Sequence, residues 1–286
     1  MSTESGLTAG VTTLMRGIKL GESPRWHGGK LWFADWVGET LFTLDEAGNS
    51  AVEARIASLP FSIDWLPDGR LLVVNARHNT LQRREADGSF VTHADLSGLS
   101  PYGCNEIVVD GRGNIYVNNV NFEFPGGEFR PGFIALITPD GQVRRVAEGL
   151  GFPNGMAITP DNQTLICGES FGKKLTAFDI AADGSLSHQR VWAEMPAWGP
   201  DGICLDAEGA VWAASGRRCV RIREGGEELE HIDIDRFCFA CMLGGADGRT
   251  LFINAADWTG KLAGPDDEPS GRVYAARVAV PRAGRP

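Results

Sequence analysis

Four oxygen-bearing side chains occupy matching places in a chain that otherwise alternates apolar runs with turns. Asp201 follows Pro200 and precedes the apolar run ICL with only Gly202 between, where a strand bound for a core has no need of a carboxylate. Glu22, Asn105 and Asn154 stand at the equivalent point of three related segments. Because neither Glu22 nor Asn105 is followed by glycine, turn chemistry does not account for them.

These four side chains indicate a metal site. Converging oxygens lose solvation and repel one another unless a cation lies among them. One Glu, one Asp and two Asn balance a dication, and an all-oxygen set suits hard ions. No His or Cys stands at these places, which disfavours a dedicated zinc site. We expect one divalent metal, with Ca²⁺ preferred and Mg²⁺, Mn²⁺ or Zn²⁺ as alternatives.

The four positions belong to a repeated hairpin, in which an apolar strand, an Asp/Gly turn and a second apolar strand follow one another. The copies recur about 40 to 50 residues apart, a spacing typical of blade-sized β repeats. Six copies are present, at 22–36, 62–76, 105–119, 154–169, 201–215 and 240–255.

A third strand and another turn follow most copies, and helical periodicity is hard to find. A β-sandwich does not need six self-similar units, whereas a ring of small sheets does. We therefore predict an all-β, six-bladed β-propeller with the metal site at the mouth of its central channel. The prediction is a single domain over 1–286, in which a strand near 11–17 closes the last blade.

Composition excludes several classes of protein. The 286 residues carry a net charge of −10 without a basic cluster, which argues against nucleic acid as a partner. No signal-peptide core or bilayer-length apolar segment stands out, so we expect a cytoplasmic protein with no membrane partner, and the oligomeric state is left open. The six cysteines lie mostly in apolar runs and are expected to be reduced and buried. The pair Cys238 and Cys241 alone is weak support for a zinc or redox site.

The phrases GESPRW, NEIVVDGRGNIYV, FPNGMAITPD and GPDGICLDAEGAVW resemble those of the senescence marker protein / gluconolactonase / luciferin-regenerating enzyme-like (SGL) family, in collinear order over nearly the whole chain. The resemblance implies a six-bladed propeller hydrolase with one catalytic divalent metal. It implies that Glu22, Asn154 and Asp201 are metal ligands, and that Asn105 is a fourth ligand or an amide that orients the substrate. The implied activity is that of a metal-dependent lactonase.

One position departs from the sugar-lactonase pattern of the family. An Arg often stands two residues before the third-blade Asn, and here that residue is Gly103. Aromatic residues stand beside several expected channel loops instead, so the small-molecule substrate is expected to be a lactone or ester less hydroxylated than a sugar lactone. The expected substrate-binding residues are Asn105, Phe61, Trp36, Asn119, Phe171 and Trp198.

For a lactone, the metal would polarise the carbonyl, and Asp201 would accept a proton from the attacking water. The absence of a G-x-S-x-G motif disfavours a covalent serine mechanism. Two alternatives remain open. The same site could hydrolyse organophosphates or phosphofluoridates, as in the family's diisopropylfluorophosphatase relatives, or the protein could be a non-catalytic metal-binding propeller that serves as an interaction platform.

Overall fold

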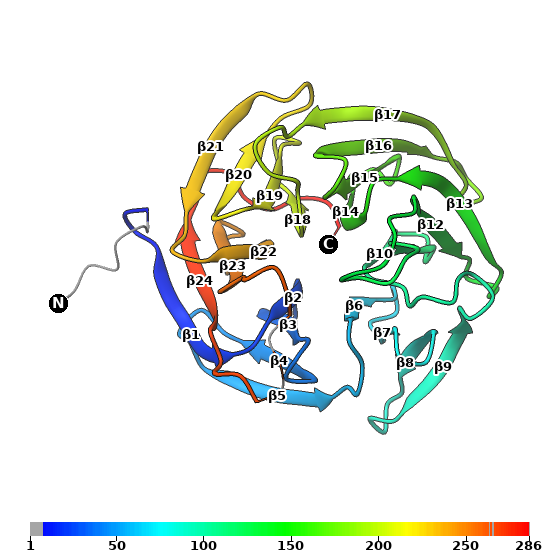
Figure 1. The fold of residues 1–286 in the computed structure, drawn as a ribbon, viewed down its shortest axis with the longest axis horizontal. Helices are drawn as coiled ribbons and strands as arrows, with labels where there is room; N and C mark the ends of the chain where they lie inside the picture. Colours follow the sequence, from blue (N-terminus) through cyan, green and yellow to red (C-terminus); the bar gives the residue numbers. More distant parts are fainter. Residues whose placement is uncertain (1–7, 263, 265, 286) are drawn as a thin grey trace.

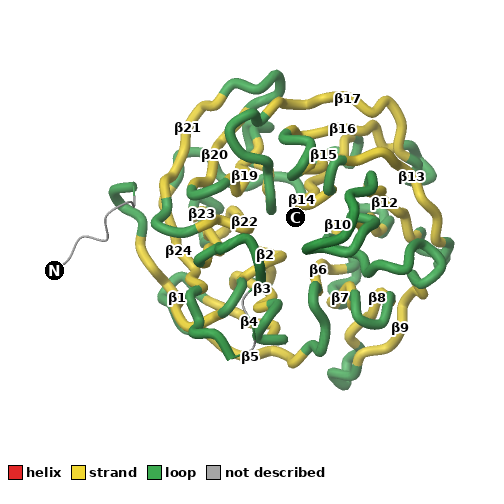
Figure 2. The backbone as a smooth tube through the Cα atoms, viewed as in Figure 1, coloured by secondary structure: helices red, strands yellow, loops and turns green. Residues whose placement is uncertain are grey.

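Six four-stranded antiparallel sheets stand around a central axis (Figure 1). The computed structural model describes residues 8–285 apart from 263 and 265. Within this part of the chain the backbone forms strands and loops without helix, as Figure 2 shows. The predicted all-β six-bladed propeller is confirmed.

The first three blades follow one another along the chain, each running from the channel outwards. Blade 1 consists of β2 (Gly21–His27), β3 (Lys30–Asp35), β4 (Thr40–Leu44) and β5 (Ser50–Arg55). Blade 2 consists of β6 (Phe61–Trp65), β7 (Leu71–Asn75), β8 (Thr80–Arg84) and β9 (Phe90–Asp95). Blade 3 consists of β10 (Ile107–Val109), β11 (Ile115–Asn119), β12 (Gly132–Ile137) and β13 (Val143–Leu150).

The last three blades keep the same order, except that the final one borrows its outer strand from the start of the chain. Blade 4 consists of β14 (Pro153–Ile158), β15 (Thr164–Glu169), β16 (Lys174–Ile180) and β17 (Leu186–Glu194). Blade 5 consists of β18 (Ile203–Leu205), β19 (Val211–Ser215), β20 (Arg218–Ile222) and β21 (Glu228–Asp233). Blade 6 consists of β22 (Phe237–Gly244), β23 (Thr250–Ala256), β24 (Gly271–Arg277) and β1 (Thr12–Ile18).

The short turns of the repeat, most of which contain Asp and Gly, join the two inner strands of each blade. In the turn between β18 and β19, Asp206 Oδ1 accepts hydrogen bonds from the backbone N–H groups of Glu208 at 2.9 Å and Ala210 at 3.0 Å. Gly209 has a φ of 78°, a left-handed conformation that favours glycine. These turns place the start of every inner strand on the opposite face of the ring.

The ring is closed by pairing between its two chain ends. Strand β1 pairs antiparallel with β24, with Thr12 opposite Ala275. This arrangement fixes the first blade to the last, because the two strands that meet come from opposite ends of the sequence.

The hydrophobic core lies between neighbouring blades. One cluster joins blades 5, 6 and 1 through fully buried side chains such as Trp212, Phe252 and Phe33. All six cysteines are buried and free of disulfides, as expected from the apolar runs around them, and neither Cys238 nor Cys241 is exposed.

The C-terminal segment reaches the centre of the ring (Figure 1). Its backbone exchanges hydrogen bonds with β14, where Arg285 and Ile158 bond in both directions, and Ala283 donates to Leu205 O at 3.0 Å. Because these partners lie at the turn ends of β14 and β18, the segment covers the face opposite the starts of the inner strands.

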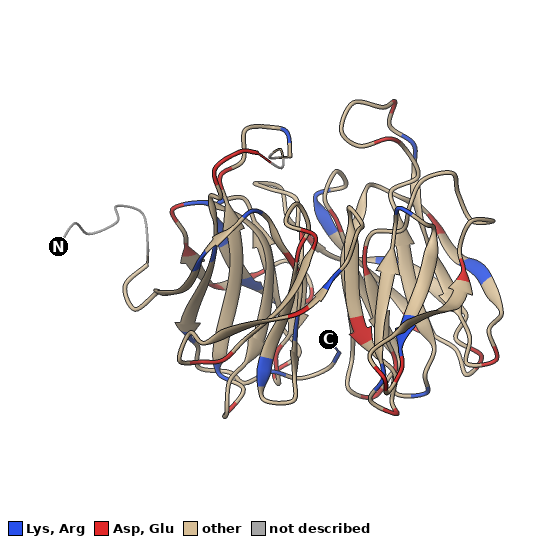
Figure 3. Ribbon diagram, turned by 90° about the horizontal axis from the view of Figure 1, so that it is seen from below, with Lys and Arg blue, Asp and Glu red and all other residues tan. Residues whose placement is uncertain are grey.

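Acidic and basic residues are interspersed around the ring in Figure 3, in line with the absence of a basic cluster from the sequence. None of the described residues form a helix with the length and apolar character that crossing a membrane would need.

Candidate functional site

A cavity of about 490 Å³ opens where the inner strands begin. Its lining includes all four oxygen-bearing residues singled out in the sequence, namely Glu22, Asn105, Asn154 and Asp201. They come from blades 1, 3, 4 and 5, and only the closed ring brings them together. We refer to them below as the oxygen cluster.

Glu22 is positioned by an irregularity in β2. The register between β2 and β3 shifts between Glu22 and Arg25, and Ser23 has a φ of 46°, which is uncommon for a residue with a side chain. Ser23 Oγ accepts a hydrogen bond from Ile63 N at 3.0 Å, which ties the bulge to blade 2. The Glu22 side chain is 4% exposed and its Oε2 accepts from Ser23 N at 3.3 Å.

Asn118 holds the two asparagines of the cluster in place. Its backbone O accepts from Asn105 N at 2.8 Å, and its Oδ1 accepts from Glu106 N at 3.1 Å. Its Nδ2 donates to Asn154 O at 2.6 Å in the next blade. A single fully buried amide therefore connects the strand starts that carry Asn105 and Asn154.

Asp201 lies two residues before β18 and is held through its backbone. Its N–H donates to Ala214 O at 2.9 Å, and its O accepts from Gly155 N at 3.2 Å. The side-chain Oδ1 is buried and has no hydrogen-bond partner among the described residues. Burial and the nearby Glu106 carboxylate raise the pKa of Asp201 to about 8, against a lowering effect of the Asn154 side chain.

Glu22 experiences the same electrostatic environment. Its burial, and then the charges of Asp201 and Glu106, raise the pKa of Glu22 well above its ordinary value. Each carboxylate makes the other harder to ionise, and a nearby cation would reverse both effects.

A buried ion pair lies beside the cluster. Arg25 Nη2 donates to Glu106 Oε2 at 3.0 Å and to Ile107 O at 2.6 Å, and both charged side chains are almost completely buried. Together with Glu22, Arg25 and Glu106 line a small void that also borders Gly155. The Arg25 charge is paired with Glu106 and only partly offsets the raised pKa of Glu22, whereas the Glu106 charge raises the pKa of both Glu22 and Asp201.

The donor set fits a hard dication. An unpartnered buried Asp201 Oδ1, a second carboxylate and two amides offer oxygen ligands at one place. The described residues contain no group of three or more His, Cys, Asp or Glu arranged to hold a metal ion, and two of these four donors are asparagines.

Three residues expected to bind substrate line the cavity, and three do not. Trp36 and Phe171 lie in its walls together with Asn105 of the cluster. Trp36 also donates from Nε1 to Phe61 O at 2.6 Å.

The others are held elsewhere by their own contacts. Phe61 is fully buried in the core between blades 1 and 2. Asn119 is fully buried, and its Nδ2 donates to Tyr102 O at 2.6 Å and Gly103 O at 3.0 Å. Trp198 is 57% exposed and lines a separate groove of about 690 Å³. The directions of these three side chains cannot be inferred from their positions in the sequence alone.

Several residues that line the cavity were not predicted from the sequence. The long loops 120–131 and 257–270 supply Phe122, Phe124 and Trp258, and the start of β22 supplies Phe237. Loops of this length carry no periodic pattern from which a direction can be inferred, and the only signal was the three phenylalanines of loop 120–131.

Gly103 also lines the cavity, and it has no room for a side chain. A Cβ built there would lie 2.4 Å from Ala76 Cβ and 2.7 Å from Ala76 Cα. An arginine at this position would require the backbone to move.

The fold and site define a six-bladed propeller with an oxygen-rich cluster at one end of its channel. Residues 20–257 match the family model described as SMP-30/Gluconolactonase/LRE-like region, and the chain belongs to this family, as its motifs indicated.

Among curated relatives, pentonolactonase XacC of Haloferax volcanii is 28% identical over 284 residues, covering 94% of this chain and 93% of the relative. Regucalcin of Xenopus laevis is 27% identical over 255 residues, covering 83% of each. Among solved structures, a luciferin-regenerating enzyme superposes with a TM-score of 0.81 at 20% identity, covering 96% of this chain and 97% of the other. The similarity to the luciferin-regenerating enzyme structure supports the fold.

Proposed function

We propose that this protein is a divalent-metal-dependent hydrolase that opens a lactone or related ester with water. The observation that carries the proposal is the oxygen cluster, which lines the cavity and in which the buried Asp201 Oδ1 has no hydrogen-bond partner among the described residues. Membership of the family and the likeness to a named pentonolactonase support lactones as the substrate class.

Glu22, Asn154 and Asp201 would hold the metal, and Asn105 would be either a fourth ligand or an amide that orients the substrate. Asn154 Nδ2 donates to Ser170 Oγ at 3.3 Å. Rotation of the Asn154 amide would exchange the positions of Nδ2 and Oδ1. Ca²⁺ is the expected ion because the donors are oxygens, and Mg²⁺, Mn²⁺ and Zn²⁺ are the alternatives to test. A bound dication would polarise the lactone carbonyl and acidify a neighbouring water.

Asp201 is the proposed proton acceptor. Asp201 lines the cavity, so its carboxylate would accept a proton from a water that attacks the carbonyl carbon of a lactone bound there. The water oxygen bonds to this carbon, the ring C–O bond breaks, and the ring oxygen leaves with a proton. One water is consumed and a hydroxy acid is formed, with Asp201 receiving and then returning the proton.

The cavity lining supports a substrate with few hydroxyl groups. A buried hydroxyl without a hydrogen-bond partner costs binding free energy, and most lining residues above the cluster are apolar. Trp36 and Phe171 are the proposed apolar residues that contact the substrate.

The decisive experiment removes and restores the metal. After chelation, the protein should not hydrolyse a panel of lactones, and one added dication should restore the activity. Asp201→Asn and Glu22→Gln should abolish both this rescue and the rise in melting temperature that the ion causes.

Glu123→Gln is the matched control, because Glu123 lines the same cavity but is exposed and outside the oxygen cluster. If the protein hydrolyses members of an organophosphate panel and no lactone, its substrates are phosphorus esters. Metal binding without turnover of either panel would favour an interaction platform.

A further inference from the structure

Five phenylalanines form one connected cluster along one side of the cavity. Phe122, Phe124 and Phe129 come from loop 120–131, and Phe152 and Phe171 come from the loops that flank β14 and β15. Phe152 contacts Phe171 with ring centroids 4.6 Å apart and Phe124 at 4.9 Å. We call these residues the phenylalanine cluster.

The phenylalanine cluster presents apolar surface to solvent. Phe124, Phe129 and Phe171 are 42%, 48% and 53% exposed, although each ring also makes an edge-to-face or tilted contact with the buried Phe122. Contiguous exposed aromatic surface is costly for a soluble protein and commonly marks a binding site. Here the surface is continuous with the cavity, since Phe124 and Phe171 line it.

Hydrogen bonds fix the loop that carries three of these rings. Asn121 adopts a φ of 64°, donates from Nδ2 to Pro131 O at 3.1 Å, and donates from its backbone N to Asn119 Oδ1 at 2.7 Å. Gly127 N donates to Glu123 O at 2.7 Å within the loop. The apolar surface is therefore held in place before any ligand arrives.

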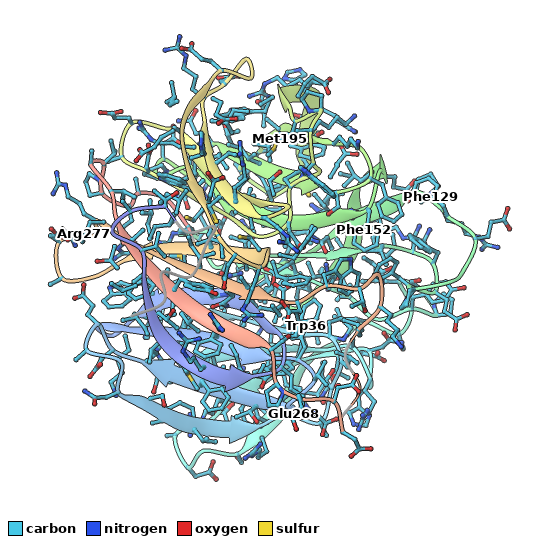
Figure 4. All side chains as sticks on the ribbon, turned by 60° about the vertical axis from the view of Figure 1, so that its left-hand side comes forward. Trp36, Phe129, Phe152, Met195, Glu268 and Arg277 are labelled. Atoms are coloured by element: carbon cyan, nitrogen blue, oxygen red, sulfur yellow. The ribbon has the colours of Figure 1, made fainter. Side chains whose placement is uncertain are left out.

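A second aromatic wall lines the cavity beside blades 6 and 1, on the other side of the ring from the phenylalanine cluster of blades 3 and 4. It consists of Trp36, Phe237, Phe239 and Trp258, with Phe239 and Trp258 in edge-to-face contact at 5.7 Å. Trp36 and Phe152, labelled in Figure 4, belong to opposite walls. Among the described lining residues none is Arg, Lys or His, so a sugar ring would find few hydrogen-bond donors.

We infer that the substrates of this site are lactones whose ring carries an alkyl or aryl substituent, and that the phenylalanine cluster binds this substituent while the carbonyl faces the oxygen cluster. The inference rests on the proposed function and adds the substrate class to it. Phe171 and Phe124 are its specificity-determining residues, since they are the exposed members of the cluster that also line the cavity.

The test compares γ-lactones that differ only in chain length, from γ-valerolactone to γ-nonalactone, together with D-glucono-1,5-lactone. The holoenzyme is assayed by acid release. Each methylene buried against the phenylalanine cluster should raise kcat/KM about 4-fold, equivalent to about 0.8 kcal/mol, until the surface is covered. The sugar lactone should be the poorest substrate, because its hydroxyls lose water without gaining partners.

Two variants test which side chain causes the dependence of kcat/KM on chain length. Phe171→Ala should lower kcat/KM for γ-nonalactone about 10-fold and leave γ-valerolactone within 2-fold. Val191→Ala should leave both within 2-fold, since Val191 is 51% exposed on β17 and belongs neither to the phenylalanine cluster nor to the cavity-lining residues. Both side chains are about half exposed, so neither truncation should prevent folding.

A flat dependence on chain length, or a preference for the sugar lactone, overturns the inference and leaves lactone hydrolysis intact. Absence of turnover with every metal would instead overturn the proposed function. In that case calorimetry compares the binding of two lactams that are not hydrolysed, 5-pentylpyrrolidin-2-one and pyrrolidin-2-one. This comparison tests whether the phenylalanine cluster binds an alkyl substituent. Tighter binding of the pentyl compound that is lost in Phe171→Ala supports the surface, and equal binding refutes it.

Discussion

Replacing Asp201 by Asn separates the charge of this side chain from its shape. Burial and the Glu106 carboxylate raise the pKa of Asp201 from 3.8 to about 8 in the folded protein, whereas the unfolded chain keeps the ordinary value. The stability that the group contributes is therefore fully present below about pH 4 and is lost as the pH rises towards 8. At pH 7 without metal, this loss amounts to about 4 kcal/mol, from 1.36 kcal/mol per pH unit above 3.8.

The neutral Asp201→Asn variant avoids this loss. In EDTA at pH 7, its free energy of unfolding should exceed that of the wild type by up to about 4 kcal/mol, and its melting temperature should be higher by about 8 °C. At pH 5 the advantage should shrink to about 2 kcal/mol. Calcium at 1,000 times its dissociation constant should stabilise the wild type by about 4 kcal/mol and the variant not at all, which closes the difference.

The assay is thermal unfolding followed by near-ultraviolet circular dichroism at both pH values, with EDTA and with Ca²⁺. Asp183→Asn is the control, because Asp183 is exposed and its pKa is lowered by hydrogen bonds from Ser185. Its stability should differ from wild type by less than about 0.5 kcal/mol in every condition. A lower melting temperature of Asp201→Asn in EDTA at pH 7, or an equal calcium-induced rise, would refute the electrostatic account of the site.

Three further results are expected. Gly103→Ala should lower the free energy of unfolding in urea by about 2 kcal/mol because its Cβ would overlap a neighbouring side chain, whereas Gly98→Ala, where nothing lies within 4 Å, should have little effect. Arg25→Met should cost about 4 kcal/mol by leaving Glu106 charged and buried, and adding Glu106→Gln should recover most of this loss in the same measurement. Truncation after Val278 should lower the melting temperature by about 6 °C, since it removes several backbone hydrogen bonds worth about 3 kcal/mol in all.

The propeller was predictable because its signals are local and repeated. Alternating apolar residues define strands, Asp and Gly define the turns, and six copies of the same hairpin leave few other architectures. The turn at Asp206 and Gly209 shows why this works, since the hydrogen bonds that form it involve residues at most four apart.

The oxygen cluster was predictable for a related reason. Repeat phase places Glu22, Asn105, Asn154 and Asp201 at equivalent strand starts, and a closed ring directs equivalent positions towards one axis. Their individual environments were not predictable, because the raised pKa of Asp201 depends on burial and on Glu106, which lies far away in the sequence.

The sequence by itself thus determined the blade number, the family and the four strand-start residues, because these depend on short-range pattern and on repetition. Only the tertiary structure decided which aromatic residues reach the cavity. It placed Phe61 in the core and Trp198 at a different groove, and it brought Phe122 and Phe124 to the mouth from an irregular loop. The direction of a side chain on a loop without periodicity depends on contacts with distant segments, and those contacts exist only once the ring has closed.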